Sequence, residues 1–366
     1  MIHCSQLRKD FETDRGRFRA VDDISFEVEK GTFFTLLGPS GCGKSTTLRS
    51  IAGLEDPDAG TIRIADQLVF SSGEGIDVAP HKRDIGMVFQ SYAIWPHMTV
   101  FENVALPLKA SRRGLSRSQI RERVLGALAK VQMDGLEDRP APHLSGGQQQ
   151  RLALARALVK EPKVMLLDEP LSNLDAKLRE QMRVELSEIL KRLNITTLYV
   201  THDQAEALAM SHRIAVMHQG RIIQTGTPQE IYCRPNSKFV ADFIGQCNFF
   251  QGEVKRLGQD GEPALVATPH GLFSCSISDN AKIGIRVLVC IRPENIRLLG
   301  EPSHAPNVVE GEVTSVAFLG EYLDCLVGIG SEESIRLHLH PTHELKKGQK
   351  VYLHMPLESL CAVQME

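Results

Sequence analysis

Residues 33–46 read FFTLLGPSGCGKST and join an apolar run to a glycine-rich loop. The loop, Gly38 to Ser45, fits the pattern G-x-x-x-x-G-K-S and is followed by a helical pattern. Glycines let the backbone curl, so its N–H groups and the helix N-terminus together form a positive concavity for phosphates. We therefore predict that Lys44 reaches the β- and γ-phosphates of a nucleotide and that the Ser45 hydroxyl binds Mg²⁺.

The composition favours a cytosolic enzyme. The chain has 366 residues, enough for two or three domains, and its formal net charge of −3 argues against nucleic acid as a partner. No apolar run approaches the roughly 20 residues of a membrane helix, and the first residues lack an apolar signal-peptide core. The eight cysteines form no C-x-x-C pair, so we expect reduced thiols rather than a zinc knuckle or a disulfide framework.

Up to about residue 240, short apolar segments alternate with helical patterns. The strand-like segments are 33–37, 85–89, 164–167 and 196–200, and the helical patterns are 116–132, 148–160, 175–193 and 203–210. This alternation predicts a layered α/β domain around a mostly parallel sheet. Residues 24–29 instead alternate apolar and polar side chains, which is typical of a half-exposed antiparallel strand.

After about residue 245 the segments become short and strand-like. They are 249–254, 264–267, 286–291, 296–299, 310–318, 322–327, 335–340 and 350–354. Glycine and proline separate them and helical periodicity is nearly absent, so we predict a small β-barrel or sandwich. The change follows Pro235 and a short helix-like segment, 238–244, and we place the domains at 1–240 and 241–366.

Two further segments contain residues that could bind or hydrolyse a nucleotide. The apolar run 164–167 ends in Asp168 and Glu169. An Asp beside a phosphate loop can hold Mg²⁺ and a neighbouring Glu can polarise water, whereas the alternative is that the pair only caps a helix. Residues 144–151, LSGGQQQR, open a helix with a Ser cap and two glycines, which predicts a second anion site. With two such helix starts but one lysine-bearing loop, two chains could sandwich one nucleotide.

The ordered set of motifs resembles the ATP-binding-cassette (ABC) ATPases. The set is GPSGCGKST, Gln90 after IGMVF, LSGGQQQR, VMLLDEP, SNLD, and His202 in YVTHD. The resemblance covers residues 1–235. It implies an α/β P-loop NTPase fold with an antiparallel β subdomain and a helical subdomain, an ATPase activity, and ATP with Mg²⁺ as cofactors.

The same resemblance implies which residues contact the nucleotide. The phosphate loop, or Walker A motif, would consist of Gly38, Pro39, Ser40, Gly41, Cys42, Gly43, Lys44, Ser45 and Thr46. The signature that contacts ATP bound by the opposite subunit would consist of Ser145, Gly146, Gly147 and Gln148, and Asp175 would communicate across the dimer.

Catalytic roles follow by resemblance as well. Glu169 would be the general base, and His202 would touch the γ-phosphate. Gln90 would sense Mg²⁺ and the attacking water, although its position alone favours a polar strand end. The implied metal ligands are Ser45, Gln90 and Asp168.

An aromatic side chain near the N-terminus is expected to stack on adenine. Phe11 stands where the family places this residue. The stretch between Glu12 and Arg19 is long, however, so Phe18 competes with it, and either ring could simply pack locally.

One phosphate loop per chain implies a homodimer, and the aromatic segment after Gln90 suggests a further partner. Residues Tyr92 to Met98 include Trp95, the only tryptophan. An exposed aromatic cluster is a plausible docking surface, and in importers of this family the region receives two integral membrane permease subunits. The alternative is that Trp95 is a core residue.

The β-rich tail resembles the oligomer-binding barrel of importer ATPases of the maltose, sulfate, polyamine and ferric-iron groups. The supporting segments are 243–245 with Asn248, 291–296 and 318–320. Residues 80–86, PHKRDIG, favour the ferric-iron and polyamine branch. We therefore expect the ATPase subunit of a bacterial importer, peripheral on the cytoplasmic face of the inner membrane and served indirectly by a solute-binding protein.

Two other classes of function remain open. A non-transport cassette ATPase of DNA repair or translation usually has two cassettes or a coiled-coil insertion, and this sequence has neither. A regulatory protein acting through its β-rich tail is the second alternative.

Overall fold

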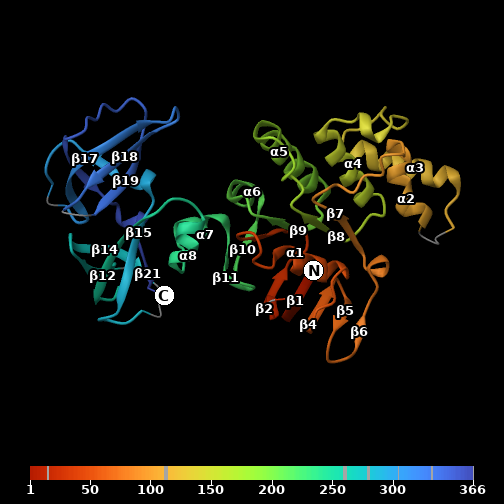
Figure 1. Ribbon diagram of the computed structural model, residues 1–366, viewed down its shortest axis with the longest axis horizontal. Coiled ribbons are helices and arrows are strands. Elements are labelled where there is room, and N and C mark those ends of the chain that lie inside the picture. The colour runs from red at the N-terminus through yellow and green to blue at the C-terminus, as the bar shows by residue number, and fades with distance from the viewer. Residues whose placement is uncertain are drawn as a thin grey trace. The chain divides into compact units, whose positions relative to one another are not determined.

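The computed structural model describes residues 1–14, 16–110, 114–258, 262–277, 281–303, 305–330 and 333–365 (Figure 1). Two compact units make up the chain, Met1–Pro228 and Gln229–Glu366. Among the helices in the described ranges, none is both long enough and apolar enough to cross a membrane.

The first unit contains a six-stranded sheet in the order β11-β10-β3-β9-β8-β7. Its strands are β3 (Phe33–Leu37), β7 (Ile85–Val88), β8 (Val164–Asp168), β9 (Thr196–Thr201), β10 (Arg213–His218) and β11 (Arg221–Gly226). All neighbouring pairs are parallel except β10 with β11. Every residue of β3, β8 and β9 is buried, as in parallel strands that are covered on both faces. The predicted parallel core is confirmed.

A second sheet of the same unit is antiparallel, in the order β2-β1-β4-β5-β6. Its strands are β1 (Ile2–Thr13), β2 (Gly16–Val28), β4 (Ala59–Ile64), β5 (Gln67–Ser71) and β6 (Ile76–Asp77). Along β2, Ile24 and Val28 are buried while Ser25 and Glu27 are exposed, which confirms the predicted half-exposed strand. The buried face shares one apolar cluster with Leu36 of the parallel sheet.

Six helices described in this unit are α1 (Lys44–Ala52), α2 (Val100–Ala110), α3 (Arg117–Lys130), α4 (Gly146–Leu158), α5 (Ala176–Leu193) and α6 (Gln204–Met210). Helices α2, α3 and α4 pack on one another and form the expected helical subdomain (Figure 1). Ser116 and Ser145 each begin a helix with a capping box, which fixes where α3 and α4 start.

The second unit begins with two short helices, α7 (Pro228–Cys233) and α8 (Lys238–Phe243). A closed barrel, β12-β13-β14-β21-β15, follows, with strands β12 (Asn248–Arg256), β13 (Ala264–Thr268), β14 (Gly271–Ile277), β15 (Arg286–Ile291) and β21 (Cys361–Gln364). A further sheet has the order β16-β20-β17-β18-β19, with strands β16 (Arg297–Leu299), β17 (Val308–Phe318), β18 (Leu323–Gly328), β19 (Ser334–Leu339) and β20 (Lys350–His354).

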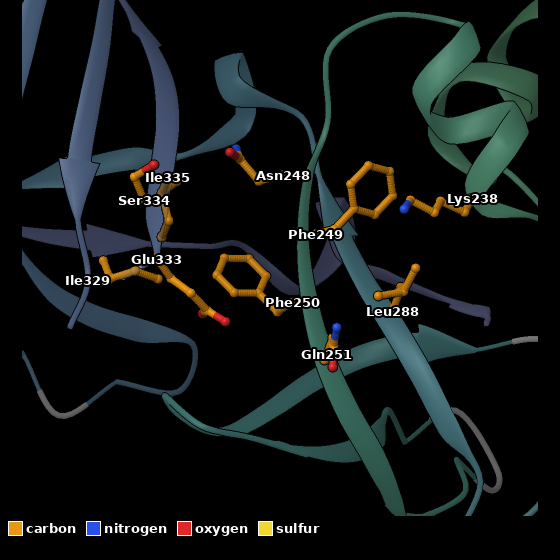
Figure 2. A pocket seen from close by; sticks show the side chains of 10 residues that line it. All are labelled: Lys238, Asn248, Phe249, Phe250, Gln251, Leu288, Ile329, Glu333, Ser334 and Ile335. Atoms are coloured by element: carbon orange, nitrogen blue, oxygen red, sulfur yellow. The ribbon is translucent and has the colours of Figure 1, made fainter. Parts of the chain in front are cut away.

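The all-β prediction for the tail is therefore confirmed, but the tail holds a second sheet in addition to the barrel. Both sheets share one apolar core, which includes Phe250 of the barrel and Leu353 of the second sheet. Asn248 connects them, because its amide donates to the Arg336 carbonyl at 2.8 Å and accepts from the Arg336 N–H at 2.8 Å. A cavity of about 240 Å³ lies beside this connection, with Phe250 and Glu333 at its wall (Figure 2).

Candidate nucleotide-binding site

The phosphate loop runs from the end of β3 to the start of α1, and its glycines are required by close neighbours. A Cβ atom at Gly38 would lie 2.3 Å from the carbonyl oxygen of Met217, and one at Gly43 would lie 2.1 Å from that of Ala20. Gly43 also has a φ of +101°, which L-residues rarely adopt. Backbone carbonyls of β2 and β10 thus lie so close to the loop that neither Gly38 nor Gly43 can carry a side chain.

Lys44 lies folded over the loop. Its Nζ donates hydrogen bonds to the carbonyl oxygens of Gly38 at 2.8 Å and Pro39 at 2.9 Å. The ammonium group is therefore bound by the carbonyl groups of the same loop whose N–H groups would bind phosphate. The Lys44 side chain is buried. This arrangement concentrates positive charge at the mouth of the loop.

Ser45 and Asp168 meet where α1 faces the end of β8. The Ser45 hydroxyl donates to Oδ1 of Asp168 at 2.7 Å, and Arg49 of α1 approaches Oδ2 at 3.3 Å. Asp168 is only 2% exposed, so the nearby guanidinium compensates for a charge that has little contact with water. A hydroxyl and a carboxylate side by side are hard oxygen donors of the kind that bind Mg²⁺ together with phosphate and water.

Glu169 and His202 form a second contact at the same edge of the sheet. Oε2 of Glu169 lies 3.0 Å from Nδ1 of His202. Glu169 follows β8 and His202 follows β9, and these neighbouring parallel strands bring their carboxyl ends together. The backbone of Glu169 has a φ of +46°, and its N–H donates to the Val200 carbonyl at 3.0 Å. This turn carries the Glu169 carboxylate towards His202.

Gln90 is at the same edge, after β7, and its side chain is exposed. Its carbonyl oxygen accepts a hydrogen bond from Nδ2 of Asn173 at 2.8 Å. Among the described residues, no hydrogen bond joins the Gln90 amide to Ser45 or Asp168. The structure thus brings Ser45 and Asp168 into contact, while Gln90 is present at the edge without a direct link to them.

The signature residues begin α4. Ser145 and Gln148 cap each other, because the Gln148 N–H reaches the Ser145 hydroxyl at 3.4 Å and the Ser145 N–H reaches Oε1 of Gln148 at 3.1 Å. A Cβ atom at Gly147 would lie 3.0 Å from Sδ of Met182, so α4 packs closely on α5. The signature belongs to the helical subdomain, whereas the phosphate loop lies at the parallel sheet (Figure 1).

Asp175, just before α5, accepts the N–H of Leu178 at 3.0 Å as the N-cap of that helix. Its carboxylate therefore fixes the start of α5, the next α-helix along the chain after the strand-end carboxylates.

The two candidate aromatic residues for adenine face each other. Phe11 of β1 and Phe18 of β2 are cross-strand partners. Phe18 is 51% exposed, whereas Phe11 is half-buried beneath Lys9, whose Nζ lies 5.2 Å from the ring centroid. Because the two residues are register partners, their positions in the sheet do not favour one over the other, and the choice between them stays a prediction.

The segment Tyr92 to Met98 is only partly as expected. Trp95 is 46% exposed, so the alternative that it is a core residue is wrong. Tyr92 is buried, however, and therefore does not contribute to an exposed patch. Two residues that the motifs did not indicate hold the segment: Arg156 donates to the carbonyls of Tyr92 and Ala93, and Asn103 accepts the Trp95 N–H at 2.9 Å.

Comparisons with known proteins show what the whole chain is similar to. Residues 21–172 match the family model of the ABC transporter, and residues 289–363 match that of the TOBE domain. The chain is 49% identical over 308 residues to the spermidine/putrescine import ATP-binding protein PotA of Rubrobacter xylanophilus, covering 83% of this chain and 78% of that protein. It is 43% identical over 337 residues to the putrescine transport ATP-binding protein PotG of Escherichia coli, covering 90% and 85%.

Solved structures give the same result for the first unit. The dimeric structure of a bacterial ABC transporter cassette is 31% identical, with a TM-score of 0.54, and covers 62% of this chain and 99% of that chain. A dimeric post-hydrolysis state of an ATP-binding cassette, bound to ADP and Pi, is 30% identical with a TM-score of 0.53, covering 62% and 99%.

The fold and the site together define an ATP-binding ATPase with a phosphate loop. The chain belongs to the ABC transporter family, as an ATP-binding protein with a C-terminal TOBE domain.

Proposed function

We propose that this chain is the ATP-hydrolysing subunit of a bacterial importer that takes up polyamines. The observation that carries the proposal is the pair of contacts at the sheet edge, Ser45 with Asp168 and Glu169 with His202, in a chain close to spermidine/putrescine import proteins. These relatives favour a polyamine over ferric iron, and they disfavour a non-transport cassette ATPase. Residues 1–240 would form the ATPase domain and residues 241–366 a regulatory domain.

A head-to-tail homodimer would complete each nucleotide site. The signature at the start of α4 would bind an anion, as helix N-termini do. It lies in the helical subdomain, whereas the phosphate loop of the same chain lies at the parallel sheet. If two chains face each other in opposite directions, Ser145 to Gln148 of one chain reach the γ-phosphate of ATP held by Lys44 of the other. The dimeric cassettes among the solved structures support this arrangement.

In hydrolysis, Lys44 would leave the carbonyls of Gly38 and Pro39 for the phosphate oxygens. Glu169 would accept a proton from the attacking water, and His202, hydrogen-bonded to it, would keep the carboxylate oriented towards the γ-phosphate. The attack is in line with the leaving oxygen of ADP. Phe11, with Phe18 as the alternative, would stack on adenine, and Asp175 would connect the two sites through the start of α5.

Ser45 and Asp168 fit Mg²⁺ because they are adjacent hard oxygen donors, and Gln90 would join them when nucleotide is bound. Mg²⁺ bound there would neutralise the negative charge that develops on the β- and γ-phosphates.

Closure and opening of this dimer would drive a separate channel. Two integral membrane permease subunits would dock at the segment Tyr92 to Met98 through Trp95, and a periplasmic or extracellular solute-binding protein would act through them. The chain would thus be peripheral on the cytoplasmic face of the inner membrane.

The test is uptake in a bacterial strain that lacks its own polyamine importers. Expression of this chain with its permease and binding-protein subunits should restore uptake of labelled putrescine or spermidine. Lys44→Ala should abolish it, while Lys30→Ala, a change at an exposed lysine outside the loop, should not. Uptake of ferric iron without polyamine would overturn the substrate assignment, and ATP hydrolysis without any permease-dependent uptake would overturn the importer.

A further inference from the structure

Three cysteines that are far apart in the sequence meet on the outside of the C-terminal barrel. Cys290 of β15 and Cys361 of β21 are directly opposite each other in the antiparallel register, and their Sγ atoms are 3.0 Å apart. Both are buried free thiols. Cys247, just before β12, donates from its thiol to the Ile291 carbonyl at 3.5 Å. The cluster thus joins the start, the middle and the end of the tail.

Strand alternation places these thiols outside the barrel core. Val289 and Ile291 of β15 point into the core, so the intervening Cys290 faces the other side. There, Cys290 and Cys361 form a small separate apolar cluster with Ala241 of α8. The thiols therefore lie under a helix at the surface of the barrel rather than deep inside it.

A cavity gives small molecules a route to the thiols. Its volume is about 180 Å³, and Cys247, Cys290, Cys361 and Arg292 are among its lining residues. This volume far exceeds the roughly 15 Å³ that a cavity needs to hold one water molecule, so a small oxidant fits. The Arg292 guanidinium is held in place by donating to the carbonyls of Ala241 at 2.7 Å and Gly245 at 2.9 Å.

The surroundings make the two thiols unequal. A hydrogen bond from Cys290 and the positive charge of Arg292 lower the pKa of Cys361, against the opposing effect of burial. Hydrogen bonds with Cys247 and Cys361, together with burial, raise the pKa of Cys290. Of the two thiols, Cys361 is therefore the one that ionises more readily. A thiolate beside a resolving thiol is the arrangement found in redox-sensing cysteines.

We propose that Cys290 and Cys361 are a modification site, a dithiol that a hydroperoxide converts to a reversible disulfide. Opposite residues of antiparallel strands have Cα atoms about 4.5 to 5.5 Å apart, which lies within the range that a disulfide requires. The bond can therefore form without a change of register between β15 and β21.

The reaction balances with one hydroperoxide. The Cys361 thiolate attacks the terminal peroxide oxygen and the O–O bond breaks. The leaving oxygen takes up the proton that Cys361 released on ionising, so an alcohol (water, from hydrogen peroxide) departs. Cys361 is then a sulfenic acid. The Cys290 sulfur attacks the Cys361 sulfur, the S–O bond breaks, and the hydroxyl leaves as water with the Cys290 proton. Two thiols are oxidised and one peroxide is reduced.

The experiment treats the reduced full-length chain with hydrogen peroxide, then counts thiols after denaturation and maps disulfide-linked peptides by mass spectrometry. Two of the eight thiols should be lost, one linked peptide pair should contain Cys290 and Cys361, and dithiothreitol should restore both thiols. Mapping needs no variant, so a folding defect cannot obscure the result. A disulfide that involves Cys247, or no loss of thiols, would overturn the proposal.

Variants then separate the two roles. Cys290→Ala should leave Cys361 as a sulfenic acid that dimedone labels, whereas Cys361→Ala should leave Cys290 unlabelled. Cys233→Ala, which removes an exposed thiol at the same cavity, should still form the disulfide. Equal labelling of Cys290 and Cys361 in the two single variants would contradict the assignment of Cys361 as the nucleophile.

Discussion

Glu169 places a carboxylate oxygen 3.0 Å from Nδ1 of His202, at the end of a buried strand. We predict that Glu169→Gln lowers ATP hydrolysis by about 10²-fold or more and leaves ATP binding intact, because an amide keeps the shape but cannot accept a proton. Phosphate release and equilibrium binding of labelled ATP measure the two effects. The ATP-bound dimer should persist on gel filtration.

The matched control is Glu27→Gln, a change of the same chemistry on the exposed face of β2. It should hydrolyse ATP at the normal rate. If purified Glu169→Gln also turns over at a near-normal rate, Glu169 is not the general base.

Cys42 lies inside the phosphate loop and is buried. Burial raises its pKa, so at neutral pH less of it is thiolate than of an exposed cysteine. We predict that alkylation of Cys42 is slower than that of the exposed Cys233, that it inhibits ATP hydrolysis, and that ATP with Mg²⁺ protects. Because its pKa is raised, the alkylation rate of Cys42 should keep rising with pH above the ordinary thiol range. Mass spectrometry over time measures both rates.

Cys42→Ser is the control for this reaction, because it removes the thiol and keeps a small side chain. Inhibition of Cys42→Ser at the same rate as the native chain would show that another cysteine is responsible.

Motif residues could be placed from the sequence because each brings a specific chemical group at a fixed spacing from its neighbours in the motif. Ser45 and Asp168 are 123 positions apart and still meet as expected. Residues that act as supports could not be found in this way. Arg49 and Arg156 carry no motif, and their partners are set by packing between distant segments.

At the scale of single elements, β9 and α6 are joined by a buried carboxylate. Glu206 accepts hydrogen bonds from Tyr199 at 2.7 Å and Thr201 at 2.6 Å. Burial raises the pKa of Glu206 despite these two bonds. As the pH rises past the ordinary carboxyl pKa, the unfolded chain ionises first while the folded chain keeps its proton. The contribution of Glu206 to stability therefore falls as pH increases through this window.

We predict that Glu206→Gln removes this contribution. Relative to the native chain, the thermal midpoint of the variant should rise as the pH increases from acid towards neutral, since the amide keeps an acceptor and does not ionise. Melting curves at several pH values give the difference. Glu188→Gln, at an exposed position of α5, should show no such trend. A constant difference across the pH range would show that Glu206 has no raised pKa.

Elements with a strong local pattern were predictable, and those defined by distant partners were not. The apolar runs predicted β3, β8 and β9, and the helical patterns predicted α3 to α6. Helix α2 contains Pro107, which signals against a helix, yet its buried face packs on α4. Strand β21 is short and is defined by its pairing with β14 and β15, so its own residues carried little signal.

At the scale of the whole molecule, the two patterns in the sequence correspond to two compact units. The first pattern alternates strands with helices, and the second consists of short strands. The number of sheets in the tail was not predictable, because alternating strands look the same in a barrel and in an open sheet. What separates the two sheets is pairing order, which depends on contacts between strands far apart in the chain. Binding of partner proteins is also not determined by the fold of one chain, and we expect Trp95 to contact the permease subunits.

Trp95→Ala should spare the isolated chain and weaken the complex. The indole is 46% exposed, and Asn103 and Arg156 hold the backbone of the segment through hydrogen bonds that do not depend on the indole. An aromatic anchor in a partner pocket contributes about 2 kcal/mol or more, so the affinity for the permease subunits should fall by roughly 30-fold. Uptake should be lost while ATP binding remains.

The measurements are a pull-down of the permease subunits and a thermal melt of the isolated chain. Leu272→Ala is the matched control, since it removes an apolar side chain that is 59% exposed in the C-terminal unit. It should leave assembly unchanged. Because Trp95 is the only tryptophan, its fluorescence should also change when the permeases bind. A steep fall of the melting midpoint in Trp95→Ala would make the indole a structural residue, and unchanged assembly would place the docking surface elsewhere on the chain.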